Sequence, residues 1–223
     1  MLYDPHTLTG KAVCDTLGVD PNCGLGKEQV SGSRARFGMN RVAGHKKKPA
    51  WRIFFEQFAD PVIYVLGAAA MLALVFGEFM EASAVFVVIL ITVIIGFAME
   101  LQAIRSMESL REMSQVVSRV LRDGKNSLIP ADQLVPGDIL LLQEGDLVTA
   151  DARLLHSDNL RIDESALTGE SFEVEKTSSP LPRDTMPADQ ANMVFNGTLV
   201  NGGYGKAVIT GTGESTMMGQ IQK

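Results

Sequence analysis

The sequence predicts a helical membrane hairpin joined to an all-β module, with a short polar N-terminal segment that holds one helix. Two observations predict this fold class. Two uncharged apolar runs lie close together, at residues 61–77 and 82–99. From residue 118 onward, turn signals such as Asp123-Gly124 and Asn196-Gly197 separate short apolar runs. Frequent turns between short apolar runs are typical of β-sandwiches and barrels.

The N-terminal segment, residues 1–48, is polar and rich in glycine. Its pattern predicts one helix over residues 27–37, which Gly38 would end. The first residues contain no positively charged stretch followed by an apolar run, so no secretory signal is predicted. We therefore expect the N-terminus to lie in the cytosol.

The two apolar runs are candidates for membrane spans. A helix that crosses the hydrocarbon core needs about 20 mostly apolar residues, with a range of about 17 to 25. Both runs lie at the lower limit, and only residues 78–81 separate them, which forces an antiparallel hairpin. The alternative is a buried hairpin in a soluble core. A helix at the surface of such a core has a polar face, and neither run has one.

The flanking charges predict the orientation of the hairpin. Lys and Arg residues precede the first run and follow the second, with Arg52 and Arg105 among them, while the turn carries Glu78 and Glu81. Because Lys and Arg mark the cytoplasmic side, both ends of the hairpin should lie inside. The chain is thus expected to be a multi-pass membrane protein whose N-terminus and β module are cytoplasmic.

The expected domain organisation has four parts. Residues 1–48 form the cytosolic N-terminal segment, and residues 49–99 form an aromatic interfacial segment followed by the two membrane helices. Residues 100–117 carry apolar residues at steps of three and four, which predicts a stalk helix. Residues 118–223 form the β module, with a proline-rich surface loop at 177–189.

Composition excludes several classes of function. The net charge of −6 gives no basic footprint for nucleic acid. Cys14 and Cys23 fit neither a CxxC pair nor a zinc pattern, so two free thiols are expected. His6, His45 and His156 are scattered, and each is expected at the surface rather than on a metal. No metal site is predicted.

Generic catalytic motifs are missing: the chain has no GxxxxGK[ST] loop, no GxGxxG after a strand and no HExxH. What remains is the segment DESALTGES at residues 163–171. A glycine between Thr168 and Glu170 permits a sharp exposed turn, and the Glu170 carboxylate could accept a proton from water. From these residues alone, a solvated loop glutamate is the commoner case.

The order of several segments resembles the P-type ATPases, specifically cation pumps related to the calcium and sodium/potassium transporters. DESALTGES resembles the family's signature loop, and three further segments match in order: LVPGD at 134–138, DLVTADARL at 146–154 and FNGT at 195–198. FGMN at 37–40 resembles the family's N-terminal region, so the match covers nearly the whole chain. Thr149 stands where the family usually has proline, and Gln220 stands where a basic residue is common.

The resemblance implies that the β module is an actuator domain, a distorted jelly-roll-like fold. In that family the loop acts on an aspartyl-phosphate. Glu170 would orient and deprotonate the attacking water, and Gly169 would let the backbone come close to the phosphate. Thr168 and Ser171 would hold the loop. These four residues, Thr168, Gly169, Glu170 and Ser171, form the predicted catalytic set.

The family forms its aspartyl-phosphate within an Asp-Lys-Thr-Gly motif, and no Asp in this chain is followed by Lys. We therefore expect the N-terminal portion of a pump, inactive alone, with no cofactor in this chain and ATP and Mg²⁺ required by the complete pump. The implied partners are the lipid bilayer, the remaining pump domains and the transported cation, without nucleic acid. One alternative is a stand-alone, membrane-anchored actuator-like protein that regulates a pump without catalysis. Another is an unrelated membrane-anchored β module.

Overall fold

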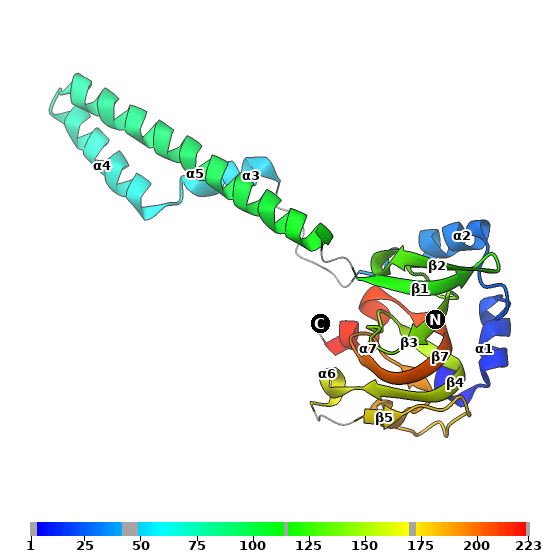
Figure 1. Ribbon diagram of the computed structural model, residues 1–223. Coiled ribbons are helices and arrows are strands. Elements are labelled where there is room, and N and C mark those ends of the chain that lie inside the picture. The colour runs from blue at the N-terminus through cyan, green and yellow to red at the C-terminus, as the bar shows by residue number, and fades with distance from the viewer. Residues whose placement is uncertain (1–3, 42–48, 114–115, 170–172, 222–223) are drawn as a thin grey trace. The chain divides into compact units, whose positions relative to one another are not determined.

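The computed structural model describes residues 4–41, 49–113, 116–169 and 173–221 (Figure 1). The chain divides into two compact units. The first joins Met1–Gly44 with Gln115–Lys223, and the second is His45–Ser114. The N-terminal segment therefore forms one body with the β module, although the sequence pattern set residues 1–48 apart.

The first unit is built on one antiparallel sheet. Its strands follow the spatial order β2-β1-β3-β7-β4-β5, and β6 pairs with β4. β4 and β7 are the longest strands, and shifts in register along their pairing bend them around each other. The strands are β1 (Val117–Arg122), β2 (Lys125–Pro130), β3 (Ile139–Gln143), β4 (Asp151–Asp163), β5 (Glu173–Glu175), β6 (Met193–Val194) and β7 (Leu199–Gly211).

Alternate residues of the central strands serve two hydrophobic cores. Leu140 of β3 and Ile209 of β7 lie in a core made only of residues beyond position 119. Ile139 and Val208, their neighbours in the chain, lie in a second core. Because side chains alternate across a strand, both faces of this part of the sheet are covered. This explains why β3 is a nearly continuous apolar run.

The N-terminal segment supplies the other half of the second core. Val13 and Cys14 of α1 (Gly10–Leu17) and Val30 of α2 (Lys27–Phe37) pack there. The predicted helix over residues 27–37 is confirmed, and Gly38 caps its C-terminal end. Gly24 has φ +71, and a side chain there would overlap the carbonyl of Leu121, so the segment lies tightly against β1.

The expectation that all three histidines lie at the surface is wrong for His6, which is 4% exposed. Its carbonyl oxygen accepts a 2.8 Å hydrogen bond from the Asn192 side chain, and its ring lies against the carbonyl of Arg183. His6 is buried because the N-terminal segment docks on the proline-rich loop. His156 is exposed, and His45 lies outside the described residues.

Short helical turns connect these elements. They are η1 (Pro5–Thr7), η2 (Ala131–Gln133), α6 (Ser165–Thr168), η3 (Pro187–Asp189), η4 (Gly213–Ser215) and α7 (Met217–Ile221). Most of the stretch at residues 177–189 has no regular structure, as its prolines predict.

The second unit consists of three helices: α3 (Ala50–Gln57), α4 (Pro61–Val75) and α5 (Phe79–Met113). Asp60 caps α4 by accepting the backbone N–H of Val62 at 2.8 Å. After α4 the chain turns through Gly77, which has φ +81, and α5 runs back beside α4 (Figure 1). α3 contacts α5 through the Phe54 and Phe97 rings, whose centroids are 5.6 Å apart.

Within the described residues, one stretch is long and apolar enough to cross a bilayer, Phe79–Met107 of α5. α3 and α4 together meet the same test only as a pair bent by 56°. Few side chains of this unit are buried, with Ile53, Ile63, Ala82 and Val93 among them. α5 continues without a break from the apolar run to Met113, as expected for a stalk, and Val117 already belongs to β1.

Candidate functional site

The predicted catalytic segment lies between β4 and β5. β4 ends at Asp163, and a carboxylate oxygen of Asp163 accepts the backbone N–H of Ser165 at 2.9 Å, which starts the one-turn helix α6. α6 ends at Thr168, and Gly169 caps it by donating its N–H to the Ser165 carbonyl at 2.9 Å. Glu170 and Ser171 lie outside the described residues.

Gly169 supplies the turn that the sequence predicted. Its φ of +74° lies in the left-handed region that favours glycine. It is exposed, and apart from its chain neighbours no described residue has an atom within 4 Å of the position that a Cβ would occupy. The described residues therefore leave space beside the Gly169 backbone.

A buried ion pair closes the base of this loop. Lys176 Nζ donates to Glu164 Oε1 at 2.6 Å, and the two side chains are 0% and 2% exposed. Burial raises the pKa of the Glu164 carboxyl, and the ammonium of Lys176 opposes that rise. Burial lowers the pKa of Lys176, and the Glu164 carboxylate opposes that fall. Lys176 Nζ also lies 5.8 Å from the centroid of the Phe195 ring.

An apolar cavity of about 220 Å³ lies beside this pair. Glu164 and Leu167 line one side of it, and Phe195 and Met217 line another. The cavity lies between the loop, α7 and Phe195, which follows β6.

Asp151, at the start of β4, fixes α7 beside the loop. One carboxylate oxygen accepts the N–H of Asn196 at 2.8 Å, and the other accepts the N–H of Met217 at 2.6 Å. Burial raises the pKa of Asp151 to about 6, and these two hydrogen bonds oppose the rise. Because both oxygens are occupied, Asp151 acts as a structural clamp.

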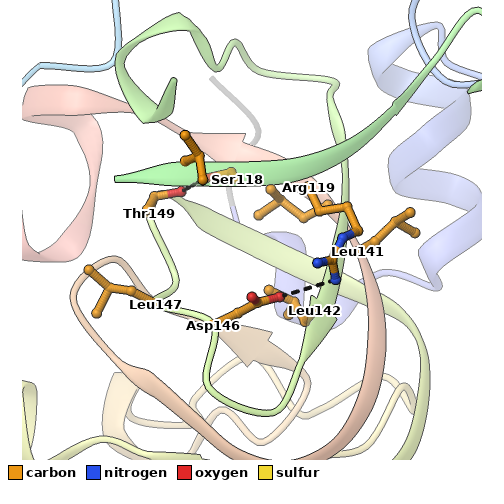
Figure 2. A pocket seen from close by; sticks show the side chains of 9 residues that line it. Ser118, Arg119, Leu141, Leu142, Asp146, Leu147 and Thr149 are labelled. Atoms are coloured by element: carbon orange, nitrogen blue, oxygen red, sulfur yellow. Dashed lines mark hydrogen bonds and ion pairs between the residues drawn. The ribbon is translucent and has the colours of Figure 1, made fainter. Parts of the chain in front are cut away.

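Thr149, the departure from proline, lies at a second cavity, between β1 and β3 (Figure 2). The Thr149 and Ser118 hydroxyls are 2.5 Å apart, and the Thr149 carbonyl accepts from Asn40 at 2.8 Å. Across the same cavity, Arg119 and Asp146 form an ion pair at 3.9 Å. The cavity measures about 10 Å³, which suits one water molecule and no substrate.

Within the described part of the chain, no three His, Cys, Asp or Glu side chains gather closely enough to hold a metal ion.

The structure thus places Thr168 and Gly169 at the predicted turn and adds two residues that sequence reasoning missed, Glu164 and Lys176. Glu164 stands in the DESALTGES segment, and Lys176 stands twelve positions after it. The only signal in the sequence was that a charged residue stands on each side of the turn. That signal does not distinguish Glu164 and Lys176 from solvated neighbours such as Glu173 and Glu175.

Comparison with known proteins agrees with this architecture. Residues 112–223 match the P-type ATPase actuator domain, and residues 5–73 match the N-terminus of cation transporters/ATPases. A calcium-transporting ATPase of Listeria monocytogenes is 43% identical over 198 residues, which is 89% of this chain and 22% of the relative.

Two further relatives come from distant organisms. A cation-transporting ATPase of Synechocystis is 39% identical over 221 residues, covering 99% of this chain and 24% of the relative. The human calcium-transporting ATPase type 2C member 2 is 35% identical over 205 residues, covering 92% of this chain and 22% of the relative. The chain spans less than a quarter of the length of these relatives, and it belongs to the P-type cation-transporting ATPases, whose N-terminal and actuator regions it matches.

Proposed function

We propose that this chain is the N-terminal portion of an ATP-driven cation pump and that its 165–175 loop dephosphorylates an aspartyl-phosphate formed elsewhere in the pump. The observation that carries the proposal is the left-handed, unobstructed Gly169 at the mouth of a loop whose base is closed by a buried ion pair. Such a turn can reach a phosphate without a side chain in the way.

The chemistry assigned to the loop is one proton transfer. The Glu170 carboxylate accepts a proton from water while the water oxygen forms a bond to phosphorus. The bond between phosphorus and the aspartyl oxygen breaks, and the aspartate leaves as a carboxylate. General-base assistance of this kind contributes about 10²- to 10⁴-fold. Gly169 gives the phosphate access, and Thr168 and Ser171 hold the loop.

ATP and Mg²⁺ are the cofactors of the complete pump in this proposal. The proton transfer assigned to the loop involves neither ATP nor Mg²⁺. On its own, the purified chain should release no phosphate from ATP above the level of its Glu170→Gln variant. Steady release by the wild-type chain alone would contradict this.

For the membrane part, we propose that α4 and α5 form the spanning hairpin, with both ends and the actuator domain in the cytoplasm. The exposed apolar side chains of both helices, such as Val65 and Ile91, favour a lipid environment. Arg52 and Arg105 stand on one side of the hairpin, and Glu78 and Glu81 stand at its turn. The lipid bilayer, the remaining pump domains and the transported cation are then the partners.

We also propose the four-part division of 1–48, 49–99, 100–117 and 118–223, with a distorted jelly-roll-like actuator domain. The long antiparallel pair of β4 and β7, whose register shifts bend it, supports this description of the β module.

The proposal is tested by Glu170→Gln in the complete pump. The phosphoenzyme is formed from radiolabelled ATP and chased with unlabelled ATP, and its decay is followed. Decay should slow by about 100-fold or more, since the general base is lost. Glu144→Gln is the matched control, because Glu144 is an exposed glutamate beside a glycine turn away from the loop. Decay of the Glu170→Gln phosphoenzyme at the wild-type rate would refute the assignment.

The regulator hypothesis has a separate test. A coding segment for Asp-Lys-Thr-Gly following this chain in the same reading frame supports a pump. A stop codon there, in a gene with its own promoter, supports a stand-alone regulator instead.

A further inference from the structure

A side-chain contact that is withdrawn from water joins the two ends of the 165–175 loop. Glu164 immediately precedes α6, and Lys176 immediately follows β5. Their charged groups meet at 2.6 Å across the base of the loop. The backbone N–H of Lys176 also donates to the Leu160 carbonyl at 2.8 Å, so Lys176 is itself fixed to β4.

The other contacts at the base are weaker. Three residue pairs join β4 to β5, Arg161 with Glu175, Ile162 with Val174 and Asp163 with Glu173. The neighbouring ion pair, between Arg161 and Glu173 at 2.9 Å, has side chains that are 54% and 43% exposed. Water and salt screen such a pair, so it contributes little.

A buried pair behaves differently from an exposed one. Removing one partner leaves an unpaired charge without solvent, which costs much more than the pair contributes. Apolar side chains of similar size can often replace both partners with little loss of stability. Stability alone therefore does not require two charges at this place. A directional contact that fixes the loop does require them.

We infer that Glu164 and Lys176 are positioning residues, which fix the two ends of the 165–175 loop and so hold the turn at Gly169 in place. This inference rests on the proposed function of the loop. Neither residue touches the reacting atoms in this account, because both are buried at the loop's base. Lys176 acts through Glu164, through the Phe195 ring and through the backbone of β4.

Hydrogen exchange on the whole chain in detergent tests the positioning. The amides of Leu167 and Gly169 report on the loop, because their N–H groups bond to Glu164 and Ser165 carbonyls. The variants are Glu164→Met, Lys176→Met and the double variant, and Arg161→Gln is the matched control that breaks the exposed pair. Denaturant midpoints of all four variants are measured in parallel.

We expect loop amides to exchange at least about tenfold faster in both single variants, because the loop then opens independently of the sheet. In the double variant the denaturant midpoint returns toward the wild-type value, while loop exchange stays fast. Arg161→Gln leaves both unchanged. Unchanged loop exchange in the single variants would overturn the inference. So would a double variant that restores loop exchange together with the midpoint, because the pair would then be merely structural.

The functional arm uses phosphoenzyme decay in the complete pump. The double variant should form phosphoenzyme from ATP at the wild-type rate and lose it about tenfold more slowly. If Glu170→Gln traps the phosphoenzyme but the double variant decays normally, the positioning role fails and the proposed function stands. If Glu170→Gln has no effect, the proposed function fails, while the exchange experiment still decides whether the pair holds the loop.

Discussion

Arg153 donates a 2.8 Å hydrogen bond from Nη2 to the carbonyl oxygen of Leu8, which lies 145 positions earlier in the chain. The Arg153 side chain is 0% exposed. Its other acceptors are also backbone carbonyls, those of Pro5, Leu154, Ser178 and Asn192. Burial lowers the pKa of Arg153 to about 10, so the guanidinium stays charged near neutral pH. One side chain thus ties the N-terminal segment and the proline-rich loop to β4.

Arg153→Lys should reduce the free energy of unfolding of the first unit by about 3 kcal/mol. Lysine has three donors on one atom and cannot reach carbonyls spread around a planar fork, so buried acceptors lose their partners at about 1–3 kcal/mol each. Denaturant titration followed by circular dichroism measures the change. Arg183→Lys is the control, because the Arg183 side chain is 84% exposed and bonds only to Asp4 in the described structure. Equal stability of the two variants would contradict the conclusion that Arg153 ties the N-terminal segment to β4.

Asp151→Asn should flatten the pH dependence of stability. The folded pKa of about 6 lies above the ordinary value of 3.8, so the folded state binds more protons between those values. Stability from this group is present below about pH 4 and is lost as the pH rises through about 6. The difference between the folded and ordinary pKa values of Asp151 corresponds to about 3 kcal/mol of unfolding free energy.

Asparagine does not titrate, so the variant should lose less stability than the wild type between pH 4 and pH 7. Burial also raises the pKa of Glu164, so this residue leaves a residual slope of stability against pH, of the same sign, in both proteins. The variant also leaves one of two backbone N–H groups unpaired, which lowers its stability at every pH. Unfolding free energies at pH 4, 5.5 and 7 measure the slopes, with the exposed Asp184→Asn as control. Parallel slopes for wild type and Asp151→Asn would contradict the assignment.

Much of the fold could be predicted from local pattern. The helix over residues 27–37 follows from its local pattern and its glycine stop, and the short strands beyond residue 118 follow from apolar runs between turn signals. The docking of the N-terminal segment could not be predicted, because its core contacts join Val13 and Leu25 to residues more than 100 positions later. The burial of His6 follows from the same long-range contact.

The candidate site was predicted in part, because local features can be predicted from the sequence and long-range contacts cannot. The turn at Gly169 is a local property of the Thr168-Gly169 sequence, and the structure has it. The pairing of Glu164 with Lys176 depends on how β5 returns along β4, which no local signal records. Glu164 and the exposed Glu173 look alike in the sequence and differ only in what the fold packs around them.

Gly203→Ala should be among the most destabilising single changes in β7. Gly203 has φ +79, and a Cβ there would overlap the backbone of Asp158 and Asn159 in β4. The two strands would have to separate where their register already shifts. We expect a loss of about 3 kcal/mol from the left-handed backbone and the overlap together. Gly145→Ala is the control, since it has φ +84 with open space and should lose only about 1 kcal/mol. Equal losses, measured by denaturant titration, would show that the close approach carries no cost.

Gly169→Ala separates the fold from the chemistry of the loop. Nothing lies within 4 Å of the new Cβ, so only the left-handed backbone is strained, at about 1 kcal/mol. The variant should fold, with the denaturant midpoint of Gly145→Ala, which carries the same backbone strain away from the loop. In the complete pump, however, the methyl group would face the phosphate that the turn approaches. Phosphoenzyme decay should therefore slow by about tenfold or more in Gly169→Ala and stay normal in Gly145→Ala. Normal decay in both would mean that the phosphate does not approach the backbone at Gly169.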